Sequence, residues 1–183
     1  MFHNLKFLLN IVGIRNLLIT LITEIVFKNC IMYTKCQRKL ILKFINNNEG
    51  DLFIDEKVLN DPLDSQIQIE IDYAGINRAD ILQRKGHYPP PKGESEIIGL
   101  ECSGKVSKLG RLVKKFSLGD QVCAILAGGG YAEFVNVDEK QVMPLPSNLN
   151  SLEAGGLPET TLTVYENIFN VSNFQKDESI LIH

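Results

Sequence analysis

Tryptophan is absent from the 183-residue sequence, and histidine occurs only three times, at His3, His87 and His183. The four cysteines include no C-x-x-C pair. Structural and catalytic zinc sites depend on closely spaced cysteine and histidine ligands. The sequence therefore lacks the common zinc-binding spacings, and we expect no bound metal.

The cysteines also indicate a cellular compartment. Cys102 and Cys123 lie in apolar, strand-like surroundings, which favours buried and reduced thiols. Reduced thiols are typical of a reducing compartment. We therefore predict a cytoplasmic protein.

Charge is spread unevenly along the chain. Residues 1–40 carry six basic residues and one acidic residue, whereas the remainder carries 13 basic and 21 acidic residues. A body with a net charge of −8 is a poor partner for phosphate backbones, so nucleic-acid binding is not expected.

One apolar stretch, residues 7–27, is long enough to raise the question of a membrane. Arg15 and Glu24 interrupt it, and such charges are costly in hydrocarbon. No small-residue cleavage site follows it, as a signal peptide would require. We interpret residues 1–31 as an extension outside the fold, with Met32 as the natural start. A mitochondrial or membrane-tethered protein is the alternative if the extension is genuine.

The body of the chain reads as short strands separated by turns. Residues 38–45 and 51–58 flank a run of asparagine and glycine, which predicts a hairpin. Residues 67–73 alternate between isoleucine and polar side chains, which predicts a half-buried strand. Further strands are expected at residues 96–110, 116–126, 131–137 and 179–182.

Helical signal is scarce and local. Asn77 can cap a helix over residues 75–86, which Gly86 ends, and a second helix is expected over residues 151–169. Residues 88–93 contain three prolines and predict a rigid loop. The three glycines at 128–130 predict a flexible loop and not a phosphate loop, because no strand-to-helix context surrounds them.

The combination "AGINRADILQRKGHYPPPKG…IIGLECSGKV…LGDQVCAIL…GGYAEFV…LPETTLTVYENI" resembles the zinc-free quinone oxidoreductase branch of the medium-chain dehydrogenase/reductase superfamily. The resemblance implies a mainly β fold: a GroES-like β-barrel with a short helix, then a linker helix and the first strand of an incomplete Rossmann domain. It places the catalytic domain at 32–150 and the linker with the Rossmann start at 151–183. The glycine-rich turn that would follow that strand is not in the sequence, so we expect a fragment or a short isoform.

The resemblance also implies a site. Zinc-dependent relatives have cysteine where this chain has Asn77, and Gly-His-Glu where it has Gly99, Leu100 and Glu101. Asn77 is implied to bind the substrate oxygen or the cofactor, although a plain helix cap is the alternative. Tyr88 is implied to flank the substrate, or else to pack on the prolines as a surface aromatic.

Thr163 is implied to contact the nicotinamide amide, and the alternative is an ordinary residue inside a helix. Glu101 is expected to be structural or to support the site from behind, and His87 to be a bystander. We thus assign catalysis to Asn77 and Tyr88 and cofactor binding to Asn77 and Thr163.

The function implied by the resemblance is reduction of quinones or α,β-unsaturated carbonyls by NADPH, with the chain inactive by itself. A homodimer is possible in the full-length enzyme. The alternative is a non-catalytic GroES-like module that acts by interaction, for example by pairing with full-length subunits.

Overall fold

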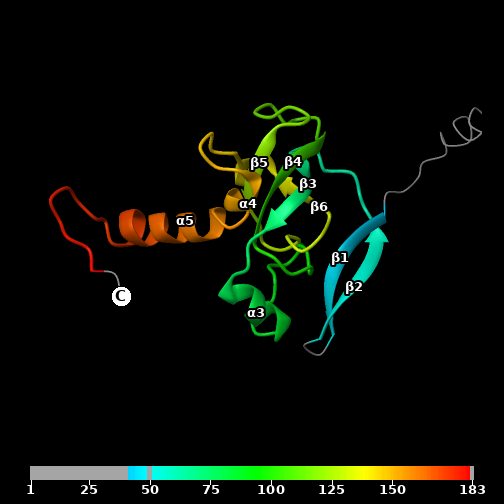
Figure 1. Ribbon diagram of the computed structural model, residues 1–183, viewed down its shortest axis with the longest axis horizontal. Helices are drawn as coiled ribbons and strands as arrows, with labels where there is room; N and C mark the ends of the chain where they lie inside the picture. Colours follow the sequence, from blue (N-terminus) through cyan, green and yellow to red (C-terminus); the bar gives the residue numbers. More distant parts are fainter. Residues whose placement is uncertain (1–40, 49–50, 182–183) are drawn as a thin grey trace, which may run out of the picture. The chain divides into compact units, whose positions relative to one another are not determined.

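The computed structural model describes residues 41–48 and 51–181, which belong to one compact unit spanning residues 40–183 (Figure 1). The predictions for residues 1–31 and for Met32 lie outside the described residues. Within the described part of the chain, none of the helices has the length and apolar character needed to cross a bilayer.

The first element is a hairpin of two antiparallel strands, β1 (Ile41–Asn48) and β2 (Asp51–Val58). The predicted hairpin is confirmed, and β2 has the predicted bounds. β1 continues through the asparagine run, which was expected to form the turn. The ladder reaches Asn48, opposite Asp51, so all three turn-forming asparagines are part of the strand.

The second sheet has five antiparallel strands in the order β6-β3-β4-β5-β7. Their bounds are β3 (Gln66–Ala74), β4 (Glu101–Leu109), β5 (Gln121–Ile125), β6 (Phe134–Asp138) and β7 (Val142–Pro144). A 3₁₀ turn, η1 (Glu139–Gln141), joins β6 to β7. The mainly β character predicted from the sequence is confirmed.

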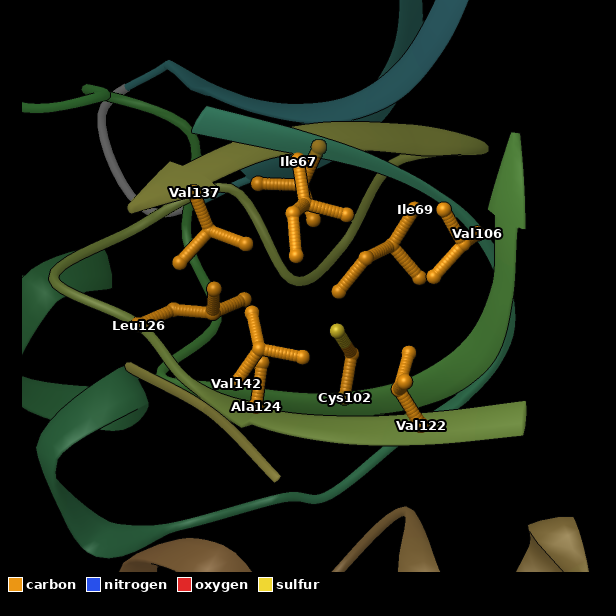
Figure 2. Close-up of a cluster of buried hydrophobic side chains, with 10 residues drawn as sticks. Ile67, Ile69, Cys102, Val106, Val122, Ala124, Leu126, Val137 and Val142 are labelled. Carbon is orange, nitrogen blue, oxygen red and sulfur yellow. The ribbon is translucent and has the colours of Figure 1, made fainter. Parts of the chain in front are cut away.

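The core lies on the inner face of this curled sheet, where aliphatic side chains from several strands point toward one another (Figure 2). Ile67 and Ile69 of β3 are fully buried, as their alternation predicts. Gln68, expected on the polar face, is buried as well. Its amide donates to the carbonyl of Asn60 (3.2 Å) and to Oδ1 of Asn136 (3.0 Å), which satisfies the buried polar group.

The strand predicted over residues 96–110 is shorter than expected, because β4 begins only at Glu101. Gly99 has a φ of +110°, a backbone conformation that interrupts a strand. The preceding residues pair instead with the glycine loop: the N–H of Gly129 bonds to the carbonyl of Ile97 (2.7 Å), and that of Gly130 to Gly99 (3.0 Å). All three glycines of the loop are buried, so the prediction of a flexible loop is wrong.

The helices are short. α3 (Arg78–Arg84) follows its predicted cap, Asn77, and ends before Gly86, whose φ is +72°. The predicted helix over 151–169 is divided into α4 (Ser151–Ala154), α5 (Pro158–Tyr165) and a π-helical segment, η2 (Glu166–Val171). Two glycines interrupt it, and proline begins α5 because its missing N–H is tolerated in the first helical turn.

The predicted strand at residues 179–182 is wrong for the part that the structure describes. Residues 178–181 have no regular structure, and the side chains of Ile180 and Leu181 are exposed. A strand needs a hydrogen-bonded neighbour. No described strand lies in register with this segment, so its apolar residues form no ladder.

Candidate functional site

A buried carboxylate, Glu101, lies at the start of β4 and holds two other elements. Its Oε1 accepts a hydrogen bond from the side-chain amide of Asn77 (2.7 Å), and its Oε2 accepts from the backbone N–H of Glu159 (2.9 Å). Only 1% of Glu101 is exposed. The carboxylate therefore connects the first residue before α3 to the first turn of α5, where an unpaired backbone N–H favours negative charge.

Asn77 has both a structural and an accessible side. It occupies the N-cap of α3 and takes part in a capping box with Asp80, whose carboxylate accepts from the backbone N–H of Asn77 (2.7 Å). The side-chain amide has two N–H groups, and Glu101 receives one of them. The residue as a whole is partly exposed.

Asp80 extends the network to a tyrosine. Its Oδ2 also accepts a hydrogen bond from the hydroxyl of Tyr131 (2.9 Å). Burial, and then the bond to Asp80, raise the pKa of Tyr131 above its ordinary value. The other carboxylate oxygen of Asp80 is buried and has no hydrogen-bond partner among the described residues. The carboxylate of Asp80 thus bonds both to the hydroxyl of Tyr131 and to the backbone of Asn77.

The approach of the chain at Gly75 depends on the absence of a side chain. A Cβ atom at this position would lie 2.0 Å from Oε1 of Glu101. Real Cβ contacts are never so short, so Gly75 is required for the carboxylate to reach Asn77.

The other residues predicted from the resemblance are exposed. Tyr88 lies in the proline loop with its side chain about half exposed, and His87 beside it is also exposed. Thr163 is on α5, one turn beyond Glu159, and its backbone carbonyl accepts from the side chain of Asn167 (2.7 Å). No hydrogen bond in the described part of the chain joins Tyr88 or Thr163 to Asn77.

The structure thus brings Asn77 and Glu101 together and leaves Tyr88 and Thr163 accessible. Three surface cavities, of about 370, 280 and 550 Å³, are lined by other residues. The first contains Asp64 and Arg111, whose charges pair with each other (2.7 Å). Among the residues that the structure describes, no group of three or more histidine, cysteine or acidic side chains is arranged to hold a metal ion.

The sequence analysis assigned no site role to Asp80 or to Tyr131. The two side chains are 51 residues apart, and no local pattern connects them. The one available signal was the position of Asp80 three residues after an asparagine cap, which predicts a carboxylate near the backbone of Asn77.

The Glu159 carboxyl makes folding sensitive to pH. Burial raises its pKa above the ordinary value, and the nearby carboxylates of Glu101 and Asp80 raise it further. The folded state therefore binds this proton more tightly than the unfolded state, and the contribution of Glu159 to stability falls as pH rises above the ordinary glutamate pKa. We expect Glu159→Gln to raise the melting temperature at pH 8 more than at pH 4. An equal gain in melting temperature at both pH values would contradict repulsion between Glu159 and the carboxylates of Glu101 and Asp80.

Two cysteines are buried in the same sheet. Cys102 and Cys123 are free thiols on neighbouring strands, which confirms the predicted burial. Burial raises the pKa of Cys102 to about 12 and that of Cys123 above its ordinary value. Both thiols should therefore stay protonated and unreactive at pH 8.

A chromogenic thiol reagent tests this protection. In a chain that carries Cys30→Ser and Cys36→Ser, we expect no modification of the native protein within an hour and full modification of both thiols in denaturant. Rapid reaction of the native protein would show that the sheet opens around them.

Comparison with known proteins gives one consistent picture. A family model described as the alcohol dehydrogenase GroES-like domain matches residues 63–147. A human protein, "Synaptic vesicle membrane protein VAT-1 homolog-like", is 32% identical over 127 residues, which are 69% of this chain and 30% of that protein. The chain thus spans about a third of the length of this relative.

Solved structures give the same result. The CurK enoyl reductase is similar with a TM-score of 0.67 and 25% identity, over 73% of this chain and 44% of that one. The Escherichia coli quinone oxidoreductase complexed with NADPH is similar with a TM-score of 0.62 and 31% identity, over 72% of this chain and 41% of that one. The GroES-like fold and the superfamily resemblance predicted from the sequence are confirmed.

Proposed function

We propose that the chain belongs to a zinc-free reductase. The premise is that residues 63–147 form a GroES-like domain of the alcohol dehydrogenase type. The hydride donor of the reductase would be NADPH, and its acceptor a quinone or an α,β-unsaturated carbonyl. Similarity to a quinone oxidoreductase bound to NADPH and to an enoyl reductase supports both kinds of acceptor.

The observation that carries the proposal is the pair of hydrogen bonds that the buried Glu101 accepts. Asn77 stands where zinc-dependent relatives have a cysteine ligand, and here its amide is bonded to Glu101. The neighbouring Leu100 is buried and apolar and cannot ligate a metal. These residues favour hydrogen bonding of a carbonyl over its polarisation by a metal ion.

The roles of the chain's own residues follow from their exposed groups. The second amide N–H of Asn77 and the hydroxyl of Tyr88 are accessible donors that can stabilise negative charge developing on a carbonyl oxygen. Because Glu101 and Asp80 fix Asn77 on two sides, its donor is oriented before a ligand arrives. Thr163 offers an exposed hydroxyl that can bond to a carboxamide.

These groups fit only the nicotinamide end of NADPH, which supplies the hydride when it is bound. The phosphates of a dinucleotide are held by a glycine-rich turn at a helix N-terminus. The run of three glycines at residues 128–130 is buried against Ile97 and Gly99 and precedes no helix. We therefore propose that the chain by itself holds the cofactor weakly and is inactive alone.

Titration calorimetry tests whether the chain binds only the nicotinamide end of NADPH. We expect the 183-residue chain to bind NADPH with a dissociation constant of roughly a millimolar or weaker, because a few hydrogen bonds contribute only a few kcal/mol. Reduced nicotinamide mononucleotide should bind about as tightly, since the remaining groups of NADPH find no partner. Micromolar binding of NADPH would contradict the division of the site.

Catalysis is tested by fusing the chain to a nucleotide-binding domain of a related quinone reductase. In an active fusion, Asn77→Ala and Tyr88→Phe should each lower kcat at least tenfold and change KM for NADPH less. Tyr165→Phe, at another exposed tyrosine, is the matched control and should leave both unchanged. An active fusion that is indifferent to the first two substitutions would remove these residues from the site.

A further inference from the structure

The two outer edges of the hairpin differ in their hydrogen bonding to the rest of the described residues. The backbone of β1 bonds to the segment before β6: the N–H of Ile45 donates to Tyr131 (2.8 Å), and the carbonyl of Lys43 accepts from Glu133 (3.0 Å). β2 pairs only with β1 among the strands that the structure describes. The other edge of β2 is therefore a row of backbone groups without a strand partner.

The register shows which backbone groups point outward. Ile45 lies opposite Ile54, and Lys43 lies opposite Glu56. Because Ile45 and Lys43 direct their backbone groups away from β2, these are non-hydrogen-bonded pairs of the ladder. Ile54 and Glu56 must then direct their own N–H and C=O groups to the open edge.

The N–H of Glu56 agrees with this geometry. It donates to the side chain of its neighbour Asp55 (2.8 Å). This one backbone donor of the open edge is therefore satisfied locally, by a side chain and not by a strand.

Apolar side chains accompany this edge. Alternation and register place Leu52, Ile54, Val58 and Ile45 on one face of the hairpin. All four are exposed, and Ile54 is the most exposed at 75%. Edge strands are templates for pairing with another chain, and this one carries charged residues, Asp55, Glu56 and Lys57, beside its apolar ones.

We propose that β2 is a self-association surface, on which a second copy of this chain pairs antiparallel about a two-fold axis at Ile54. This register places Ile54 opposite Ile54, Leu52 opposite Glu56, and Phe53 opposite Asp55. The two outward-facing Ile54 backbones then exchange both hydrogen bonds, and the apolar faces of the two hairpins become continuous.

The charges of β2 select this register. An axis at residue 55 would place Asp55 opposite Asp55, and an axis at residue 56 would place Glu56 opposite Glu56. An axis at Phe53 would place Asp51 opposite Asp55. Like charges directly opposite are destabilising in antiparallel sheets. The axis at Ile54 avoids all of these pairs.

The association should be weak. An edge pairing of a few residues buries well under the roughly 1,600 Å² of a standard protein interface. We therefore expect a dissociation constant on the order of 100 μM, which makes the dimer dependent on concentration. The proposal is independent of the proposed enzymatic function.

Sedimentation equilibrium of the 183-residue chain between about 10 μM and 1 mM is the first test. Ile54→Lys should raise the dissociation constant at least tenfold, because it places two ammonium groups opposite each other at the axis. Leu112→Lys, at another exposed leucine, is the matched control and should change nothing. A wild-type chain that stays monomeric over this concentration range would overturn the proposal. Equal effects of the two lysine variants would overturn it as well.

Disulfide trapping tests the register without relying on a charged substitution. In a Cys30→Ser, Cys36→Ser background, Ile54→Cys should form a covalent dimer at least tenfold faster than Leu112→Cys. Leu52→Cys should cross-link faster with Glu56→Cys than with itself. Equal cross-linking rates at positions 54 and 112 would contradict a two-fold pairing at Ile54.

Discussion

Glu101→Ala should lower the free energy of unfolding by about 3 kcal/mol. The substitution leaves the partly buried Asn77 amide and Glu159 N–H without their acceptor, and a donor that loses its partner away from water costs about 1–3 kcal/mol. Relief of repulsion on Glu159 works in the opposite direction, which keeps the estimate below the sum. Urea titration monitored by circular dichroism measures the difference.

Two further variants identify the cause of the loss. Glu101→Gln keeps the volume and one acceptor oxygen, so about half of the loss should remain. Glu70→Ala removes an exposed carboxylate from the adjacent strand and should cost under about 0.5 kcal/mol. If Glu101→Ala were as mild as Glu70→Ala, the carboxylate would not hold the two helix ends together.

Gly75→Ala should be nearly as damaging, with a loss of about 2–3 kcal/mol, although it adds only a methyl group. The new Cβ would lie 2.0 Å from Oε1 of Glu101, and the buried carboxylate would have to leave its bond with Asn77. Gly75→Ala should thus break the same hydrogen bond between Asn77 and Glu101 that Glu101→Ala removes.

This common cause predicts a strong coupling between the two positions. In a Glu101→Ala background the clash disappears, so Gly75→Ala should then cost under about 1 kcal/mol. Gly86→Ala, where a Cβ meets nothing within 4 Å but φ is +72°, is a control for backbone effects and should show no coupling. Additive losses at positions 75 and 101 would mean that the clash does not involve the carboxylate.

The sequence by itself determined the elements that depend on nearby residues. The alternation of Ile67 and Ile69 placed β3 because a sheet with one buried face repeats every two residues. Asn77, as a capping residue, located the start of α3 because capping is a local hydrogen-bonding arrangement. The motifs also predicted a GroES-like domain, and the model of the alcohol dehydrogenase GroES-like domain matches residues 63–147.

Tertiary structure decided everything that depends on distant partners. The glycines at 128–130 were expected to be flexible, but the backbone of residues 97–99 supplies bonds that bury them. Residues 179–182 were predicted to form a strand, yet no described strand pairs with residues 179–181, the part that the structure describes. A sequence pattern records which residues favour a strand, whereas a ladder requires a neighbour.

The candidate site divides in the same way. Asn77 and Glu101 were each recognisable from motifs, but their bond joins residues that are 24 apart in sequence, and the bond to Glu159 joins residues that are 58 apart. Folding places the two helix ends on either side of a single buried carboxylate. Because a buried charge must be compensated by donors, this arrangement gives Asn77 a fixed orientation, which no local pattern in the sequence could reveal.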